Sequence, residues 1–238
     1  MAEESAGTPK GVQRDAISTR LPQVFLPRAN LFYRAFLLAI PFGALVGGYT
    51  WYRLCRSPDI TEVRMPIGQP VMFSHRHHVG DLKIDCRYCH TSAEKSSFAG
   101  VPSTQICMSC HSQLFTDSPL LEPVRESAAA GRPIAWNRVH NLPDYVYFNH
   151  SIHVNKGVGC TTCHGAVNEM PLMMKTQTLF MEWCLQCHRD PARTQRPDSE
   201  IYSVSWEPGP KQGETGAALA LKHHLDSEHL TNCSVCHR

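Results

Sequence analysis

The sequence has few of the long periodic segments that build a conventional folding core. Proline and glycine are numerous, with 17 and 15 residues among 238, and both interrupt regular secondary structure. An excess of positive charge is also missing, because 16 Lys and Arg stand against 18 Asp and Glu from Ser57 onward. Nucleic-acid binding needs a basic face, so this balance argues against nucleic acid as a partner.

Cysteine is almost missing outside one repeated pattern. Ten of the eleven cysteines occur in five copies of C-x-x-C-H, and Cys55 stands alone. The copies are CRYCH (86–90), CMSCH (107–111), CTTCH (160–164), CLQCH (184–188) and CSVCH (233–237). A disulfide framework or a set of redox motifs gives no reason for this spacing to recur five times. A structural zinc site gives no reason for a histidine after every second cysteine.

The pattern indicates covalently bound haem c. Two thiols one helical turn apart form thioethers to the haem, and the adjacent histidine reaches the iron. Five copies therefore predict five haem groups. The predicted attachment residues are Cys86, Cys89, Cys107, Cys110, Cys160, Cys163, Cys184, Cys187, Cys233 and Cys236. The predicted proximal iron ligands are His90, His111, His164, His188 and His237.

Nine further histidines supply candidates for the distal position of each iron. The pattern F-x-H-x-x-H occurs at residues 73–78 and again at 148–153, and two haem motifs follow each copy. This repetition predicts a duplicated dihaem module, at about residues 66–111 and 141–188. The distal candidates, of which five or fewer are needed, are His75, His78, His140, His150, His153 and His224, with His223 as an alternative to His224. His77 and His229 are expected at the surface.

Methionine is the competing distal ligand, and it raises the potential of the haem that it ligates. Four methionines lie between the third and fourth motifs, namely Met170, Met173, Met174 and Met181. Thioethers at such spacing usually pack against a macrocycle or a core. One haem with His/Met ligation stays open as an alternative.

A single long uncharged run precedes the first motif. It covers residues 35–52, and its 18 residues span about 27 Å as a helix, enough for a bilayer. We expect an uncleaved signal anchor at 31–52 rather than a cleaved signal peptide, because about 30 residues precede the run and no A-x-A site follows it. Basic residues are more frequent before the run than after it. Residues 1–30 are therefore expected in the cytoplasm and 53–238 in the periplasm, with the anchor in the inner membrane.

The predicted fold is a mainly irregular and α-helical multihaem domain packed around its haem groups, preceded by one transmembrane helix. The clearest helix has Ser118 as N-cap, Pro119 at its first position and Gly131 at its end. A connection rich in Pro and Gly is expected from about Asp190 to Gly216. The fifth haem module follows it at about 217–238.

The paired modules resemble multihaem cytochromes of the c3 and c7 type. In those proteins the first histidine of F-x-H-x-x-H ligates the haem bound just downstream, and the second serves another haem. The resemblance implies that His75 caps the haem of Cys86 and Cys89, and that His150 caps the haem of Cys160 and Cys163. His78 and His153 then reach neighbouring haems.

Residues 30–238 also resemble the pentahaem cytochrome subunit of alternative complex III. The resemblance rests on the anchor, the two modules, the segments VHNLPDYVYFNH and MEWCLQCHRDP, and the final CSVCHR. It implies a membrane complex that oxidises quinol and passes electrons to a periplasmic cytochrome or an oxygen reductase. The implied partners are an iron–sulfur protein, polytopic quinol-binding subunits and a monohaem cytochrome. No residue of this chain is then expected to be catalytic.

Two other functions are compatible with a multihaem chain. A stand-alone, membrane-anchored quinol dehydrogenase feeding a soluble reductase would oxidise quinol as the purified chain. A reductase of a small oxyanion would need an open iron, commonly one bound by C-x-x-C-K, and none of the five motifs has this lysine.

Overall fold

The computed structural model describes residues 25–237 and divides into two units, residues 1–53 and 54–238. Most of the predicted cytoplasmic segment, including Lys10, Arg14 and Arg20, lies outside the described residues. The described chain is helical or irregular, and between residues 25 and 237 it forms isolated β-bridges but no strand. This confirms the predicted fold class.

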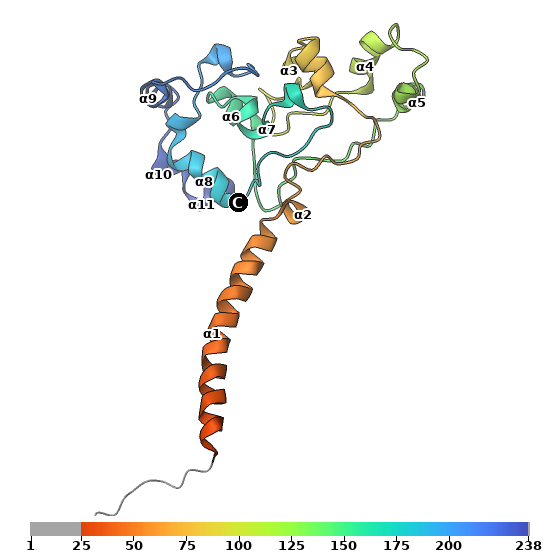
Figure 1. Cartoon of the computed structure of the whole chain (residues 1–238). Helices are drawn as coiled ribbons and strands as arrows, with labels where there is room; N and C mark the ends of the chain where they lie inside the picture. The colour runs from red at the N-terminus through yellow and green to blue at the C-terminus, as the bar shows by residue number, and fades with distance from the viewer. Residues whose placement is uncertain (1–24, 238) are drawn as a thin grey trace, which may run out of the picture. The chain divides into compact units, whose positions relative to one another are not determined.

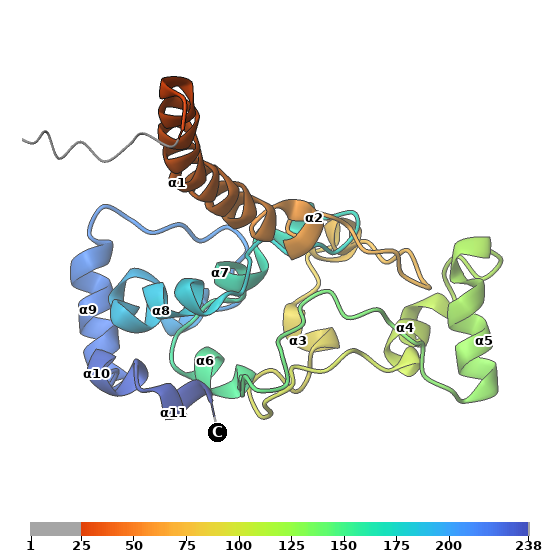
Figure 2. The ribbon, with the colours of Figure 1, turned by 90° about the horizontal axis from the view of Figure 1, so that it is seen from below.

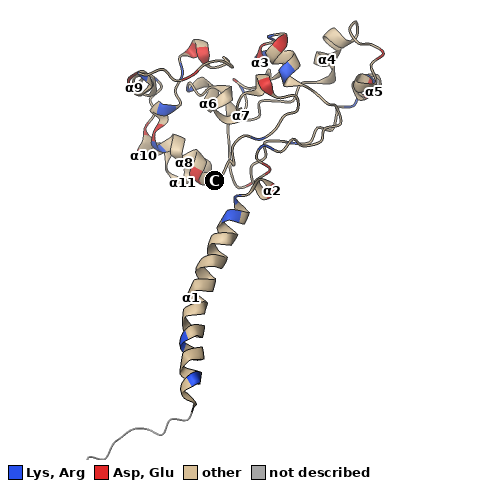
Figure 3. Ribbon diagram, viewed as in Figure 1, with Lys and Arg blue, Asp and Glu red and all other residues tan. Residues whose placement is uncertain are grey.

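In the first unit, the described residues from Pro27 onward form one long helix, α1 (Pro27–Cys55), whose last two residues belong to the second unit (Figure 1). By length and composition it is suited to cross a membrane, with 29 residues, a mean hydropathy of 1.6 and no buried side chain. Its charged residues lie near its two ends (Figure 3). Pro41 lies inside the helix. The helix includes the predicted anchor at 31–52, whose insertion and orientation stay predictions.

The second unit is built from short helices joined by long loops (Figure 1). The α-helices are α2 (Pro58–Thr61), α3 (Cys86–Cys89), α4 (Thr104–His111), α5 (Glu122–Ala130), α6 (His150–Asn155), α7 (Cys160–His164), α8 (Met181–Arg189), α9 (Gln212–Lys222), α10 (Ser227–Leu230) and α11 (Cys233–Cys236). A π-helix, η1, covers Arg76–Asp81. The 3-10 turns are η2 (Pro119–Leu121), η3 (Val167–Glu169), η4 (Pro191–Arg193) and η5 (Asp198–Glu200).

The helix predicted after Ser118 is confirmed. Ser118 is extended, and the turn that follows, η2, starts at Pro119. The chain continues as α5 and ends at Gly131, whose φ of 61° is the left-handed conformation that glycine adopts at little cost. Pro123 lies in the first turn of α5, where its missing N–H removes no helical hydrogen bond.

The predicted connection from 190 to 216 is too long, because α9 already begins at Gln212. The side-chain amide of Gln212 donates to the carbonyl oxygens of Ala192 and Gln195, at 3.1 and 2.9 Å. Gly216 then packs directly onto Ala192. These tertiary contacts anchor the start of α9 within the segment that sequence composition marked as a loop.

The apolar core formed by protein atoms is small. Among residues 25–237, eight apolar side chains are buried, namely Val71, Val124, Val139, Val154, Val167, Met170, Ile201 and Ala220. A globular domain of this length normally buries most of its apolar surface within one core. The shortage is what a domain that packs around large apolar cofactors requires.

Candidate haem sites

Each C-x-x-C-H pattern lies on a helical turn, so residues three apart place both thiols on one side. The motifs occupy α3, the second half of α4, α7, α8 and α11. Two of these turns begin with a capping side chain: Asp85 accepts from the N–H of Arg87 at 2.8 Å, and Asn232 accepts from the N–H of Ser234 at 3.1 Å. All eleven cysteines are free, which leaves the ten motif thiols available for thioether bonds.

Four of the proximal histidines are oriented by backbone carbonyls. A carbonyl oxygen only accepts, so the ring Nδ1 carries the proton and donates it. The bonds run from His90 to Gly100 (2.7 Å), from His111 to Leu114 (3.2 Å), from His188 to Leu230 (2.9 Å) and from His237 to Tyr145 (3.0 Å). A proton on Nδ1 leaves Nε2 with a free lone pair, which is the tautomer of a metal-bound histidine.

The first F-x-H-x-x-H segment brings His78 opposite the second haem motif. The ring centroids of His78 and His111 are 6.2 Å apart. Nδ1 of His78 donates to the Ser74 carbonyl at 2.9 Å, which leaves its Nε2 free. Metal–imidazole bonds of roughly 2 Å on both sides separate two ring centres by about 6 Å. The space between these two rings therefore fits one iron.

The second F-x-H-x-x-H segment repeats this geometry at the fourth haem motif. The ring centroids of His153 and His188 are also 6.2 Å apart, and Nδ1 of His153 donates to the Asn149 carbonyl at 2.7 Å. The phenylalanine of the pattern has the same role in both copies. Phe73 stacks on His78 and Phe148 stacks on His153, each with a centroid distance of 4.4 Å.

The first histidines of the two segments lie near the first and third motifs. The rings of His150 and His164 are nearly parallel, with an interplanar angle of 12° and centroids 6.4 Å apart. His75 is half-buried, and burial, followed by the proximity of His90 and His78, lowers its pKa to about 4. Nδ1 of His75 is buried without a hydrogen-bond partner. Such an atom usually marks a group that the described atoms do not include.

The remaining candidate histidines lie in positions less suited to a distal ligand. The ring of His140 lies 4.3 Å from that of His164 and edge-on to it, too close for an iron between these two rings. His224 is exposed, with a left-handed φ of 53°. His223 is largely enclosed, and its Nε2 has no hydrogen-bond partner. His77 and His229 are exposed, as expected.

The fifth motif differs from the others in its surroundings. The ring of Tyr145 lies beside that of His237, with centroids 5.9 Å apart. Of the four methionines proposed as alternatives, Met170 is buried and Met181 is exposed. Among residues 25–237, no distal candidate places its ring against that of His237.

The motif thiols show which attachment sites are neighbours. The Cys160 thiol donates a hydrogen bond to Cys86, which lowers the pKa of Cys86 to about 7 and joins the first site to the third. Burial raises the pKa of Cys89, and nearby Cys107 raises it further, so the first and second sites are also close. Cys163 lies near Cys187, and Cys184 lies near Cys236. Adjacent sites are therefore second and first, first and third, third and fourth, and fourth and fifth. Figure 2 shows α4, α3, α7 and α8, which carry the first four motifs, in this order.

The residues present fit haem c. The thiol pairs, the histidine ring pairs about 6 Å apart, the unpartnered nitrogens of buried histidines and the small apolar core all suit a large apolar group with a metal at its centre. Haem c supplies an iron that cycles between the ferric and ferrous states, with a potential tuned by its ligands and surroundings.

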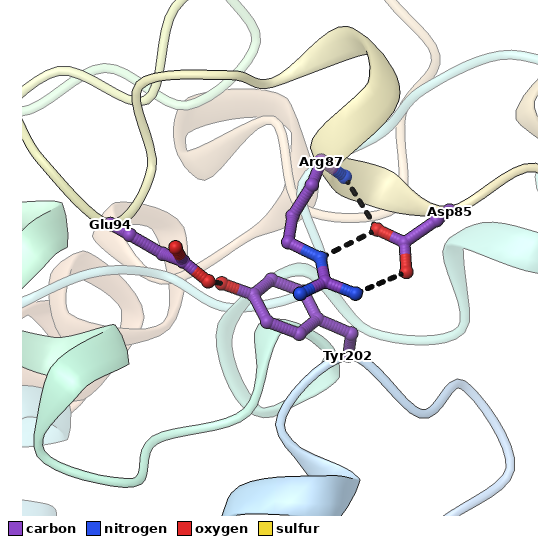
Figure 4. Close-up of polar contacts among 4 residues, drawn as sticks. All are labelled: Asp85, Arg87, Glu94 and Tyr202. Carbon is purple, nitrogen blue, oxygen red and sulfur yellow. Dashed lines mark hydrogen bonds and ion pairs between the residues drawn. The ribbon is translucent and has the colours of Figure 1, made fainter.

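A polar cluster beside the first motif was not expected from the sequence (Figure 4). The Arg87 guanidinium donates to both carboxylate oxygens of Asp85, at 3.0 and 2.9 Å, and its Cζ lies 4.5 Å from the centroid of the Tyr202 ring. The Tyr202 hydroxyl donates to Glu94 at 2.5 Å. The cluster ties the loop after η5 to the first module. It joins residues too distant in the sequence for any local pattern to reveal it.

Comparison with known proteins agrees with these sites. The family model for cytochrome c3 matches residues 152–238. The chain is also 31% identical, over 176 residues, to the multiheme cytochrome c subunit of menaquinone reductase from Nitratidesulfovibrio vulgaris. That alignment covers 71% of this chain and 77% of the relative.

Proposed function

The chain belongs to the family of multihaem c-type cytochrome subunits that includes this relative, and we propose that it is the five-haem subunit of a membrane-bound quinone/quinol oxidoreductase. Electron transfer and covalently bound haem c follow from the family. The count of five is our proposal. It rests on the five C-x-x-C-H motifs, each on a helical turn. The repeated 6.2 Å spacing of His78 from His111 and of His153 from His188 supports an iron at two of them.

We assign the distal ligands from the same contacts. His78 pairs with His111, His153 with His188, His150 with His164, and His75 with His90. The ring spacings support the first three pairs, and the proximity of His90 to His75, which helps to lower the pKa of His75, supports the last. For the fifth iron the candidates are His140, His224 and a methionine.

We further propose that α1 is an uncleaved single-pass anchor in the inner membrane. The amino terminus would lie in the cytoplasm and the haem domain, residues 53–238, in the periplasm. The apolar span between Arg34 and Arg53 supports the anchor. Attachment of haem c to reduced thiols outside the cytoplasm supports the orientation.

The partners follow from two resemblances that differ in the direction of electron flow. Alternative complex III oxidises quinol. A resemblance to its pentahaem subunit implies an iron–sulfur protein, polytopic quinol-binding subunits and a monohaem cytochrome as partners. The relative from N. vulgaris is named for menaquinone reduction. We propose the quinol-oxidising complex and keep menaquinone reduction as the second candidate. A single apolar helix without an acidic residue or histidine in its span offers no quinone site of its own.

The test starts from the detergent-solubilised complex purified through this chain. Co-purification of polytopic and iron–sulfur subunits, low-spin EPR signals, and menaquinol oxidation coupled to reduction of a cytochrome would support the proposal. Menaquinone reduction by a reduced cytochrome donor, without the reverse reaction, would select the second candidate. Quinol oxidation by the isolated chain, or a high-spin signal that changes with nitrite, would contradict both.

A further inference from the structure

Arg196 is a buried cation behind the third haem motif. Arg196 is 4% exposed, and its backbone N–H donates to the Gly157 carbonyl at 3.0 Å. The guanidinium Nη2 donates to both middle residues of CTTCH, to Thr161 Oγ1 at 2.7 Å and to Thr162 Oγ1 at 3.1 Å. Nη1 donates to the Ser203 carbonyl at 3.3 Å. Three hydrogen bonds thus fix the charge against the turn that carries Cys160 and Cys163.

No carboxylate among the described residues forms an ion pair with Arg196, although the Glu200 carboxylate lies close enough to act on its charge. The Nε of Arg196 is buried without a hydrogen-bond partner. The Trp206 ring covers one face, with its centroid 4.4 Å from Cζ. A guanidinium stays protonated even when buried, and an unpaired buried charge is costly. The nearby Arg87, by contrast, is exposed and paired with Asp85.

The backbone around Arg196 leaves room for it. A Cβ at Gly159, the residue just before Cys160, would lie 2.4 Å from Cζ of Arg196. A side chain at Gly157 would meet Gln195 at 2.8 Å, and φ at this glycine is +81°. Gly159 therefore permits the close approach of the guanidinium to the motif, and Gly157 permits the close approach of the neighbouring Gln195 side chain.

We propose that Arg196 is a positioning residue that holds a fixed, unpaired positive charge against the third haem motif and thereby raises the reduction potential of the iron bound there. Reduction adds one electron to the ferric iron, and a nearby cation in a site of low dielectric favours the more negative product. Burial also protects this effect from screening by salt. The inference rests on the proposed haem at Cys160 and Cys163.

The test is an EPR-monitored redox titration of the full-length, haem-loaded chain in its purified complex. Arg196→Gln removes the charge and keeps hydrogen-bonding capacity, and Arg196→Lys keeps the charge. We expect Arg196→Gln to lower the potential of one low-spin component, with about a tenfold fall in its ferrous-to-ferric ratio at fixed ambient potential, equivalent to 59 mV for one electron. Arg196→Lys should retain most of the wild-type potential.

A matched control and a second pair of variants distinguish an effect of charge from a folding defect. Arg193→Gln removes an exposed cation that lies outside the five motifs, and it should shift no component. If Arg196→Gln does not accumulate, Thr161→Asp places a carboxylate where the Thr161 hydroxyl accepts from the retained guanidinium, with Thr161→Asn as its isosteric partner. The Asp variant should lower the same component, and the Asn variant should not.

The inference is overturned if the third haem is present and its potential is unchanged in both Arg196→Gln and Thr161→Asp. It is also overturned if Arg196→Lys shifts the potential as far as Arg196→Gln, because the hydrogen bonds rather than the charge would then be responsible. Mass spectrometry of the peptide containing Cys160 and Cys163 separates these results from failure of the proposed function. A haem-free peptide would remove the premise and the inference together.

Discussion

The ring centroids of His78 and His111 lie 6.2 Å apart, although the two residues belong to different helical turns, η1 and α4. The pairing connects the segment before the first motif to the second motif. In the proposed ligand assignment, His78 therefore serves a different haem from His75, three positions earlier. Such sharing would hold two haem sites close together.

His78→Ala should open one iron. We expect one low-spin signal to disappear and a high-spin signal to take its place, because His111 would be left as the one protein ligand of that iron. EPR and visible spectra of the oxidised protein measure the change. The matched control is His77→Ala, which removes the adjacent, exposed imidazole and should leave the spectrum unaltered. An unchanged low-spin spectrum in His78→Ala would show that the distal ligand is another residue.

The wild-type chain should carry five haem groups, measured by pyridine haemochrome and intact mass. Replacing both Cys233 and Cys236 by serine should reduce the count to four, because thioether attachment needs these thiols. Cys55→Ser serves as the control and should keep all five, since Cys55 lies outside the motifs. A count of five in the double variant would mean that the fifth motif is not an attachment site.

Asp85→Asn should lower the free energy of unfolding at neutral pH but not at acidic pH. Hydrogen bonds from Arg87 hold the pKa of Asp85 below its ordinary value. Its contribution is therefore full above the ordinary carboxyl pKa of about 4 and is lost as pH falls through the lower folded-state value. Both side chains are about half exposed, so the difference should be under about 1 kcal/mol at neutral pH. Melting temperatures of the two proteins from pH 7 to pH 2 should converge at the acidic end, and a constant difference would contradict the assignment.

Gly216→Ala should destabilise the packing of α9 on η4. The added Cβ would lie 1.9 Å from the Ala192 carbonyl oxygen, a clash with backbone that should cost about 3 kcal/mol. Gly213→Ala, in the same helix, meets nothing within 4 Å and should stabilise by up to about 1 kcal/mol through helix propensity. Thermal melts of the two variants should therefore move in opposite directions. Equal melting temperatures would mean that α9 does not pack on η4 in solution.

Local sequence patterns predict the parts of this fold that depend on local geometry. The spacing of C-x-x-C-H predicts a helical turn at each motif, and Ser118, Pro119 and Gly131 predict the ends of a helical segment. The repetition of F-x-H-x-x-H predicts two similar modules. In each of these cases, the local geometry is determined by residues of one short sequence segment.

Contacts between distant segments were beyond the reach of such patterns. Nothing near Cys86 or Cys160 in the sequence indicates that these two thiols meet. The π-helical form of η1 also differs from the α-helical form of α6, although the two segments share their pattern. Arg196 is surrounded by unremarkable residues, and its role depends on a loop folding back over α7.

The hydrogen bond from His237 to the Tyr145 carbonyl joins positions 92 residues apart. During synthesis, the segment leading into the second module must therefore wait for a histidine made much later before it gains this partner. The backbone N–H of Tyr147 also donates to the Cys236 carbonyl, at 2.8 Å. Two hydrogen bonds therefore join the fifth motif to the segment before the second module, so that haem attachment at this motif would be coupled to the folding of that segment.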